Sequence, residues 1–130
     1  LHTYFEQVAS KKLAALPAHS VTASLRHLLF RHLPGRQRPH IEDYSALLGM
    51  SARSLQRALR QEETSFTKLV EEVQQELARE YLARGHTIQE CCWMLSFSEP
   101  RAFHRAFKRW TGMTPSQWRA QTRDDAFSPS

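Results

Sequence analysis

One pattern occurs twice in this sequence, and the duplication restricts the fold more than any other feature. Each copy consists of a short apolar helix pattern, a tight turn and a second helix pattern with a basic side; the copies span Ile41–Leu59 and Ile88–Phe107. Because a repeated pattern marks a repeated supersecondary unit, the chain is predicted to build two similar helix pairs. Two helices joined by such a short turn are typical of the helix-turn-helix motif.

The second helix pattern of each copy has one basic side and one apolar side. Four polar residues recur at i, i+3, i+4 and i+7, a spacing that places them on the same side of a helix. They are Arg53, Gln56, Arg57 and Arg60 in the first copy and Arg101, His104, Arg105 and Lys108 in the second. The opposite sides carry Leu55 and Leu59 in the first copy and Phe103, Phe107 and Trp110 in the second.

The residue types on these basic sides suit base recognition. Arginine pairs with guanine, and glutamine with adenine, through two hydrogen bonds in the major groove of DNA. A single basic helix face can equally be solvated charge. The same placement in both copies, with no acid at any of these positions, favours recognition of DNA.

Length and charge set the frame for this interpretation. The 130 residues predict one domain, or one domain with a tail, and a hydrophobic content of 41% supports a packed core. The net charge of +5 suits a polyanionic partner but is weak evidence alone. Six glutamates fall between Gln61 and Glu80, and we expect this stretch to face away from DNA because phosphate would repel it.

The remaining segments show helical patterns and no strand pattern, which predicts an all-α fold. An apolar stripe from Val21 to Leu33 predicts one helix before the first helix-turn-helix unit. A second stripe predicts a long linker helix, about 66–84, between the units at about 41–61 and about 88–110. Such a helix is about 27 Å long, close to the roughly 34 Å between successive major grooves on one side of DNA.

Helix boundaries are predicted from residues that cap or interrupt helices. Side-chain caps are expected at Ser51, Ser65, Thr87 and Ser98. Glycines that tolerate positive φ are expected at the first turn and at two helix ends: Gly49, Gly85 and Gly112. Thr114 and Pro115 are expected to open a short last helix.

Several residues have a second interpretation. Cys91 and Cys92 could form a redox switch, but small core residues are favoured, because cysteine behaves as a modest hydrophobe. The three tryptophans fall on predicted apolar faces and are assigned to the core rather than to base stacking: Trp93, Trp110 and Trp118. The histidines follow no metal-ligand pattern, so we expect no metal, no cofactor and, without a catalytic arrangement, no enzyme. No apolar run is long enough to span a membrane.

The two motifs resemble the DNA-binding domain of the AraC/XylS family of bacterial transcription regulators. The similarity is carried by Leu48–Arg57 and, more specifically, by Phe97–Ser116, within a domain of about 20–123. It implies about seven helices, which form two helix-turn-helix subdomains joined by the long helix, and it implies that the second helix of each subdomain enters one of two adjacent major grooves. It also implies base-contacting residues at Arg53, Ser54, Gln56, Arg57, Pro100, Arg101, His104 and Arg105.

The resemblance also suggests how the protein works. Arg60 and Lys108 lie deeper along their helices and are predicted phosphate contacts, which fix register while base contacts select sequence. The expected partner is double-stranded promoter or operator DNA, with RNA polymerase as a further candidate, in the bacterial cytoplasm at the nucleoid. A small effector would act only through an upstream domain, of which residues 1–19 would be the tail; residues 124–130 are expected to be disordered. The alternative is an all-α interaction module whose basic faces bind an acidic protein.

The sequence departs from the family pattern at three places. Ser96 stands where the family usually has glycine in the second turn, and a left-handed backbone at a non-glycine residue costs about 1–2 kcal/mol. Pro100 lies in the first turn of the second recognition helix, where it removes a backbone donor. Cys91 and Cys92 replace the usual pair of an apolar residue and alanine.

Overall fold

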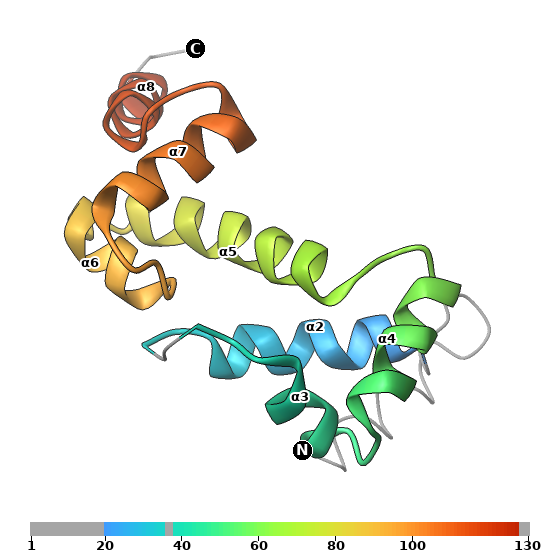
Figure 1. Cartoon of the computed structure of the whole chain (residues 1–130). Coiled ribbons are helices and arrows are strands. Elements are labelled where there is room, and N and C mark those ends of the chain that lie inside the picture. Colours follow the sequence, from blue (N-terminus) through green and yellow to red (C-terminus); the bar gives the residue numbers. More distant parts are fainter. Residues whose placement is uncertain (1–19, 36–37, 128–130) are drawn as a thin grey trace. The chain divides into compact units, whose positions relative to one another are not determined.

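The computed structural model describes residues 20–35 and 38–127, which form seven helices and no strand (Figure 1). The helices are α2 (Val21–His32), α3 (Ile41–Leu47), α4 (Ala52–Gln61), α5 (Phe66–Ala83), α6 (Ile88–Met94), α7 (Pro100–Thr111) and α8 (Pro115–Phe127). The predicted all-α class is confirmed. The predictions for residues 1–19 and 128–130 lie outside the described residues.

The chain divides into two compact units. The first contains most of α2, all of α3 and α4, and α5 as far as Glu71; the second contains α5 from Glu72 together with α6, α7, α8 and the segment that follows α2. Helix α5 is continuous across this boundary. It is the predicted linker helix, and its bounds agree with the expected range to within one residue.

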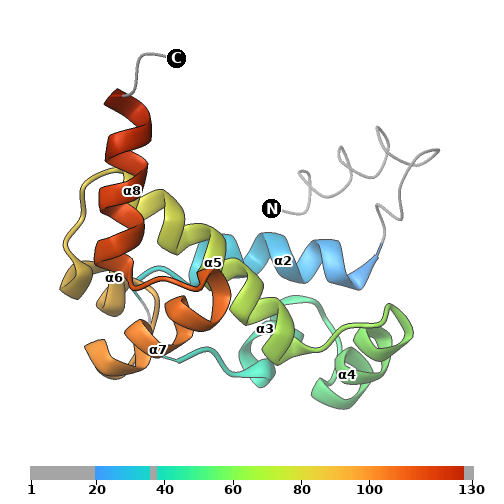
Figure 2. The same cartoon turned by 90° about the horizontal axis from the view of Figure 1, so that it is seen from above.

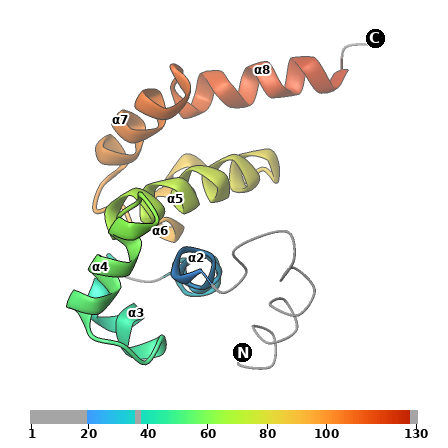
Figure 3. The ribbon, with the colours of Figure 1, turned by 90° about the vertical axis from the view of Figure 1, so that its right-hand side faces the viewer.

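The core of the first unit is formed by leucines. Residues at helical spacing on α2 are fully buried, as are two residues of α4: Leu25, Leu28, Leu29, Leu55 and Leu59. Helices α3 and α4 contact one another and are joined by a short turn (Figure 3). The ring centroids of Tyr44 and Phe66 lie 5.7 Å apart, and this contact packs α3 against the start of α5.

Aromatic rings dominate the core of the second unit. Phe103 and Phe107 of α7 are fully buried, with their ring centroids 5.8 Å apart. Helix α7 contacts both α6 and α8 (Figure 2). Trp118 of α8 packs edge-on against Phe107 at 5.9 Å. The buried Gln74 side chain of α5 donates to the Leu95 carbonyl at 2.9 Å and so holds the end of α6.

Most predicted helix ends are confirmed. Ser51, Ser65 and Thr87 each accept a backbone N–H three residues further on. The three glycines named above have positive φ, and so does Ser96, at 68°. The prediction that Ser98 caps α7 is wrong. Helix α7 begins at Pro100, and a proline forces the preceding residue into extended backbone, so Glu99 is the N-cap residue.

Two further expectations are wrong. Trp93 is 67% exposed, because the short α6 buries the side that carries Cys91 and Cys92 and leaves Trp93 on the other side. Trp110 and Trp118 are only half-buried but do contact core rings. The last helix is longer than expected: α8 runs from Pro115 to Phe127, and no glycine or proline interrupts it.

Candidate nucleic-acid interface

Helix α4 has the two sides that the repeat predicted. Its buried residues are Leu55 and Leu59, both 0% exposed. The side chains of the other face are all exposed: Arg53, Ser54, Gln56, Arg57 and Arg60. The structure therefore brings the predicted residues of the first unit together on a single solvent-facing helix surface.

The start of α4 is held by two serines. The Ser51 hydroxyl accepts the Ser54 N–H at 3.1 Å and lies 3.0 Å from the Ser54 hydroxyl. When Ser51 donates to Ser54, the Ser54 hydroxyl keeps its own proton for another acceptor. The predicted contact residue Ser54 is thus positioned by the cap of its own helix.

Helix α7 repeats this arrangement in the second unit. Pro100, Arg101, Arg105 and Lys108 are exposed, while His104 is half-buried. The opposite side carries the buried Phe103, Ala106 and Phe107. All the predicted positions lie on one face of α7, and the histidine is the least accessible of them.

The turns that precede α4 and α7 have the same backbone conformation, although a glycine occupies one turn and a serine the other. In the first unit, Gly49 has φ 70° and the Met50 N–H donates to the Ser45 carbonyl at 3.0 Å. In the second, Ser96 has φ 68° and the next N–H donates to the Cys92 carbonyl at 3.0 Å. The repeat is therefore preserved in the backbone even where glycine is replaced.

A contact not anticipated from sequence anchors the second turn. The Ser96 hydroxyl donates to the Leu33 carbonyl at 3.4 Å, and the Gly35 N–H donates to the Met94 carbonyl at 3.1 Å. These bonds attach the segment after α2 to the end of α6. They join residues about sixty positions apart, so no local pattern could have revealed them.

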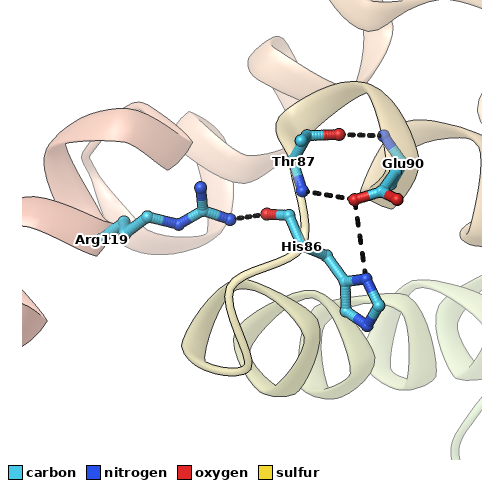
Figure 4. A network of polar contacts seen from close by, with 4 residues as sticks. All are labelled: His86, Thr87, Glu90 and Arg119. Carbon is cyan, nitrogen blue, oxygen red and sulfur yellow. Dashed lines mark hydrogen bonds and ion pairs between the residues drawn. The ribbon is translucent and has the colours of Figure 1, made fainter.

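A polar network holds the start of α6 (Figure 4). The Thr87 N–H donates to the Glu90 carboxylate at 2.8 Å, and the Glu90 N–H donates to the Thr87 hydroxyl at 3.0 Å. The Thr87 N–H bond is the main reason that the pKa of Glu90 is lowered. The Arg119 guanidinium of α8 donates to the His86 carbonyl, and His86 Nδ1 lies 3.7 Å from the Glu90 carboxylate.

This network was only partly visible in the sequence. Thr87 was identified as a cap, but its partner was missed, although Thr87 and Glu90 have the spacing of a capping box. Arg119 was not identified at all, because its contact is 33 residues away in sequence. The sequence spacing of Thr87 and Glu90 could have revealed their pairing, whereas the Arg119 contact can be found only from the folded structure.

The two cysteines are core residues rather than an exposed thiol pair. Both are free and buried, and Cys91 has no exposed surface. Burial raises the pKa of Cys91 to about 11. The pKa of Cys92 is raised by burial and, secondarily, by the negative charge of Glu99. At neutral pH both thiols therefore stay protonated, which disfavours the redox interpretation.

Neither of two other kinds of site is found in the described part of the chain. No group of three or more His, Cys, Asp or Glu residues there is arranged to hold a metal ion. None of the helices described is long and apolar enough to cross a membrane. The two basic faces thus remain the candidate site, within a pair of helix-turn-helix units.

Comparison with known proteins identifies the family. A family model described as a helix-turn-helix domain matches residues 44–121. An uncharacterised HTH-type transcriptional regulator of Mycobacterium tuberculosis is 36% identical over 99 residues, which cover 75% of this chain and 28% of that protein. The ornithine utilization regulator of Pseudomonas aeruginosa is 33% identical over 116 residues, covering 88% of this chain and 34% of the regulator.

A solved structure shows the same fold. The DNA-binding domain of AdpA, a global transcriptional factor, was crystallised with a target DNA and superimposes with a TM-score of 0.70 at 21% identity. The match covers 82% of this chain and 96% of that domain. This chain belongs to the AraC-type helix-turn-helix family of transcription regulators. It spans roughly a third of the length of the curated relatives it matches.

Proposed function

We propose that this chain is the DNA-binding part of a transcription regulator and that α4 and α7 each enter a major groove. The observation that carries the proposal is the recurrence of an exposed face rich in base-reading residues, opposite a buried apolar face, on the second helix of both motifs. The family membership and the shared fold of a domain crystallised with its target DNA support it.

Each face has two roles in this proposal. The side chains nearer the helix starts read base edges: Arg53, Ser54, Gln56 and Arg57 on α4, and Pro100, Arg101, His104 and Arg105 on α7. Arg60 and Lys108 lie further along and contact phosphates, which fix the register but carry no sequence information. Two grooves one helical turn apart correspond to a site of about 16–20 base pairs.

The rest of the biological context follows as part of the same proposal. The domain acts by binding alone, on promoter or operator DNA at the bacterial nucleoid. RNA polymerase is its candidate protein partner, and a small effector acts through a separate upstream domain.

The proposal is tested by selecting bound duplexes from a library with a random segment of about 25 base pairs, at about 150 mM salt to suppress nonspecific phosphate attraction. We expect enrichment of two short motifs about one helical turn apart. The matched control is Arg79→Ala, which removes an exposed arginine from α5 and should leave both motifs unchanged. Binding without enrichment would favour the interaction module, whose basic faces recognise charge alone.

A further inference from the structure

The two recognition helices start differently. Ser51 caps α4 through a side-chain hydrogen bond, as described above. Glu99 occupies the same position before α7, with extended backbone at φ −156° and ψ 155°, and its side chain makes no cap hydrogen bond. A side-chain cap is worth about 0.5–2 kcal/mol, so α7 begins without a stabilising contact that its counterpart has.

The Glu99 carboxylate is exposed, and the one interaction found for it among the described residues is the effect of its charge on the Cys92 thiol. The carboxylate makes no hydrogen bond or ion pair with the described residues, and no acid occurs in the first turn of α7. Pro100 and Arg101, the next two residues, are proposed to lie at the bases. Because the first residues of a recognition helix approach base edges most closely, this negative charge stands at the edge of the groove-facing surface.

A carboxylate in that position discriminates between bases. It accepts hydrogen bonds and donates none, and the major-groove edges of guanine and thymine carry no donor. Cytosine and adenine offer exocyclic amines. In adenine an N7 acceptor lies beside the amine and repels the second carboxylate oxygen, whereas cytosine has no acceptor at the neighbouring position.

We infer that Glu99 is a specificity-determining residue that selects cytosine at the base pair facing the start of α7 and rejects guanine there. The inference rests on the proposed function, since it requires α7 to enter the groove. It adds a negative charge to a set of base-contacting residues that are otherwise basic or neutral. Specificity often depends on such an unfavourable contact with the wrong partner.

The test compares the motifs selected by the full chain and by its Glu99→Gln and Glu99→Ala variants. The wild type is expected to prefer cytosine over guanine by about tenfold at one position of the second motif. Glu99→Gln keeps the shape but adds donors, so guanine becomes acceptable; Glu99→Ala removes the discrimination. In both variants the other positions of the motif stay unchanged.

Two controls separate this role from a structural one. Ser98→Ala alters the neighbouring exposed side chain and should leave the motif intact. Far-ultraviolet circular dichroism and thermal unfolding establish that each variant is folded, as expected for an exposed side chain that forms no hydrogen bond or ion pair with the described residues. Binding of four synthetic duplexes that differ only at the selected base pair then gives the preference directly.

The outcomes distinguish the two proposals. A motif that is enriched by the wild type and unchanged in Glu99→Gln would overturn the role of Glu99 and leave the proposed function standing. No enrichment by the wild type would overturn both. A cytosine preference lost only when Glu99 is changed would support both.

Discussion

Among the described residues, two that are not glycine adopt left-handed backbone, and they illustrate how the same strain can have different consequences. Glu63 has φ 61° after α4, and Ser96 has φ 68° after α6. Such a conformation costs a non-glycine residue about 1–2 kcal/mol. Ser96 offsets the cost with its hydroxyl bond to Leu33, whereas Glu63 is exposed and no side-chain bond is found for it among the described residues.

Replacing each residue by glycine should therefore give different results. Glu63→Gly is expected to raise the free energy of unfolding by about 1 kcal/mol, because only strain is removed. Ser96→Gly is expected to change it little, because the relief is cancelled by loss of a hydrogen bond worth about 1 kcal/mol. Urea denaturation measures both, with Glu63→Ala as the control for lost charge. A gain from Ser96→Gly as large as that from Glu63→Gly would show that the Leu33 bond contributes nothing.

At the scale of single elements, helix ends carry much of the specificity of the fold. The start of α2 is capped from outside: the Glu62 carboxylate accepts the N–H groups of Val21 and Thr22 at 3.1 and 3.0 Å. A carboxylate also suits the positive end of the helix dipole. The start of α6 is capped from within, by the reciprocal pair of Thr87 and Glu90. Glu62 therefore caps a helix that is distant in sequence, whereas Glu90 caps the helix to which it belongs.

The capping pair of α6 predicts a specific dependence on pH. The pKa of Glu90 is lowered in the folded protein, chiefly by the Thr87 N–H bond, so its contribution to stability is present above the ordinary carboxyl range and is lost as the pH falls through the folded value. Glu90→Ala should lower Tm at pH 7, and the difference from the wild type should narrow toward pH 3, as measured by thermal unfolding.

The matched variant is Glu90→Gln, which keeps an acceptor for the Thr87 N–H but cannot ionise. Its Tm deficit at pH 7 should be smaller than that of Glu90→Ala. A deficit for Glu90→Ala that stays constant from pH 7 to pH 3 would mean that ionisation of Glu90 does not stabilise the helix start.

At the scale of the whole molecule, sequence patterns predict the repeated helix pairs and the local helix ends, but they do not predict contacts between residues far apart in the chain. The linker helix, the two helix pairs and their basic faces follow from periodicity and from Gly and Ser positions, and the count of about seven helices follows from the family resemblance. The role of Glu62 was missed because its targets lie about forty residues earlier in the chain. The misassignment of Trp93 has a related cause: seven residues are too few to define which side of α6 is buried.

The division into two units leads to the last prediction. Arg57 and Arg105 lie in different units and share no partner among the described contacts, so their contributions to DNA binding should be additive. Each alanine substitution is expected to cost about 1–3 kcal/mol and to relax the preference at one position of its own motif. The double variant should lose the sum, measured by titration with the selected duplex.

Lys108→Ala provides the contrast within the same experiment. As a phosphate contact it should weaken binding to all duplexes alike and reduce the slope of log K against log salt by about one unit. Loss from the double variant equal to that of one single variant would mean that the two units do not bind one duplex simultaneously. Additive losses would mean that each unit reads its own groove independently, so that an operator's affinity is the product of two separately specified half-sites.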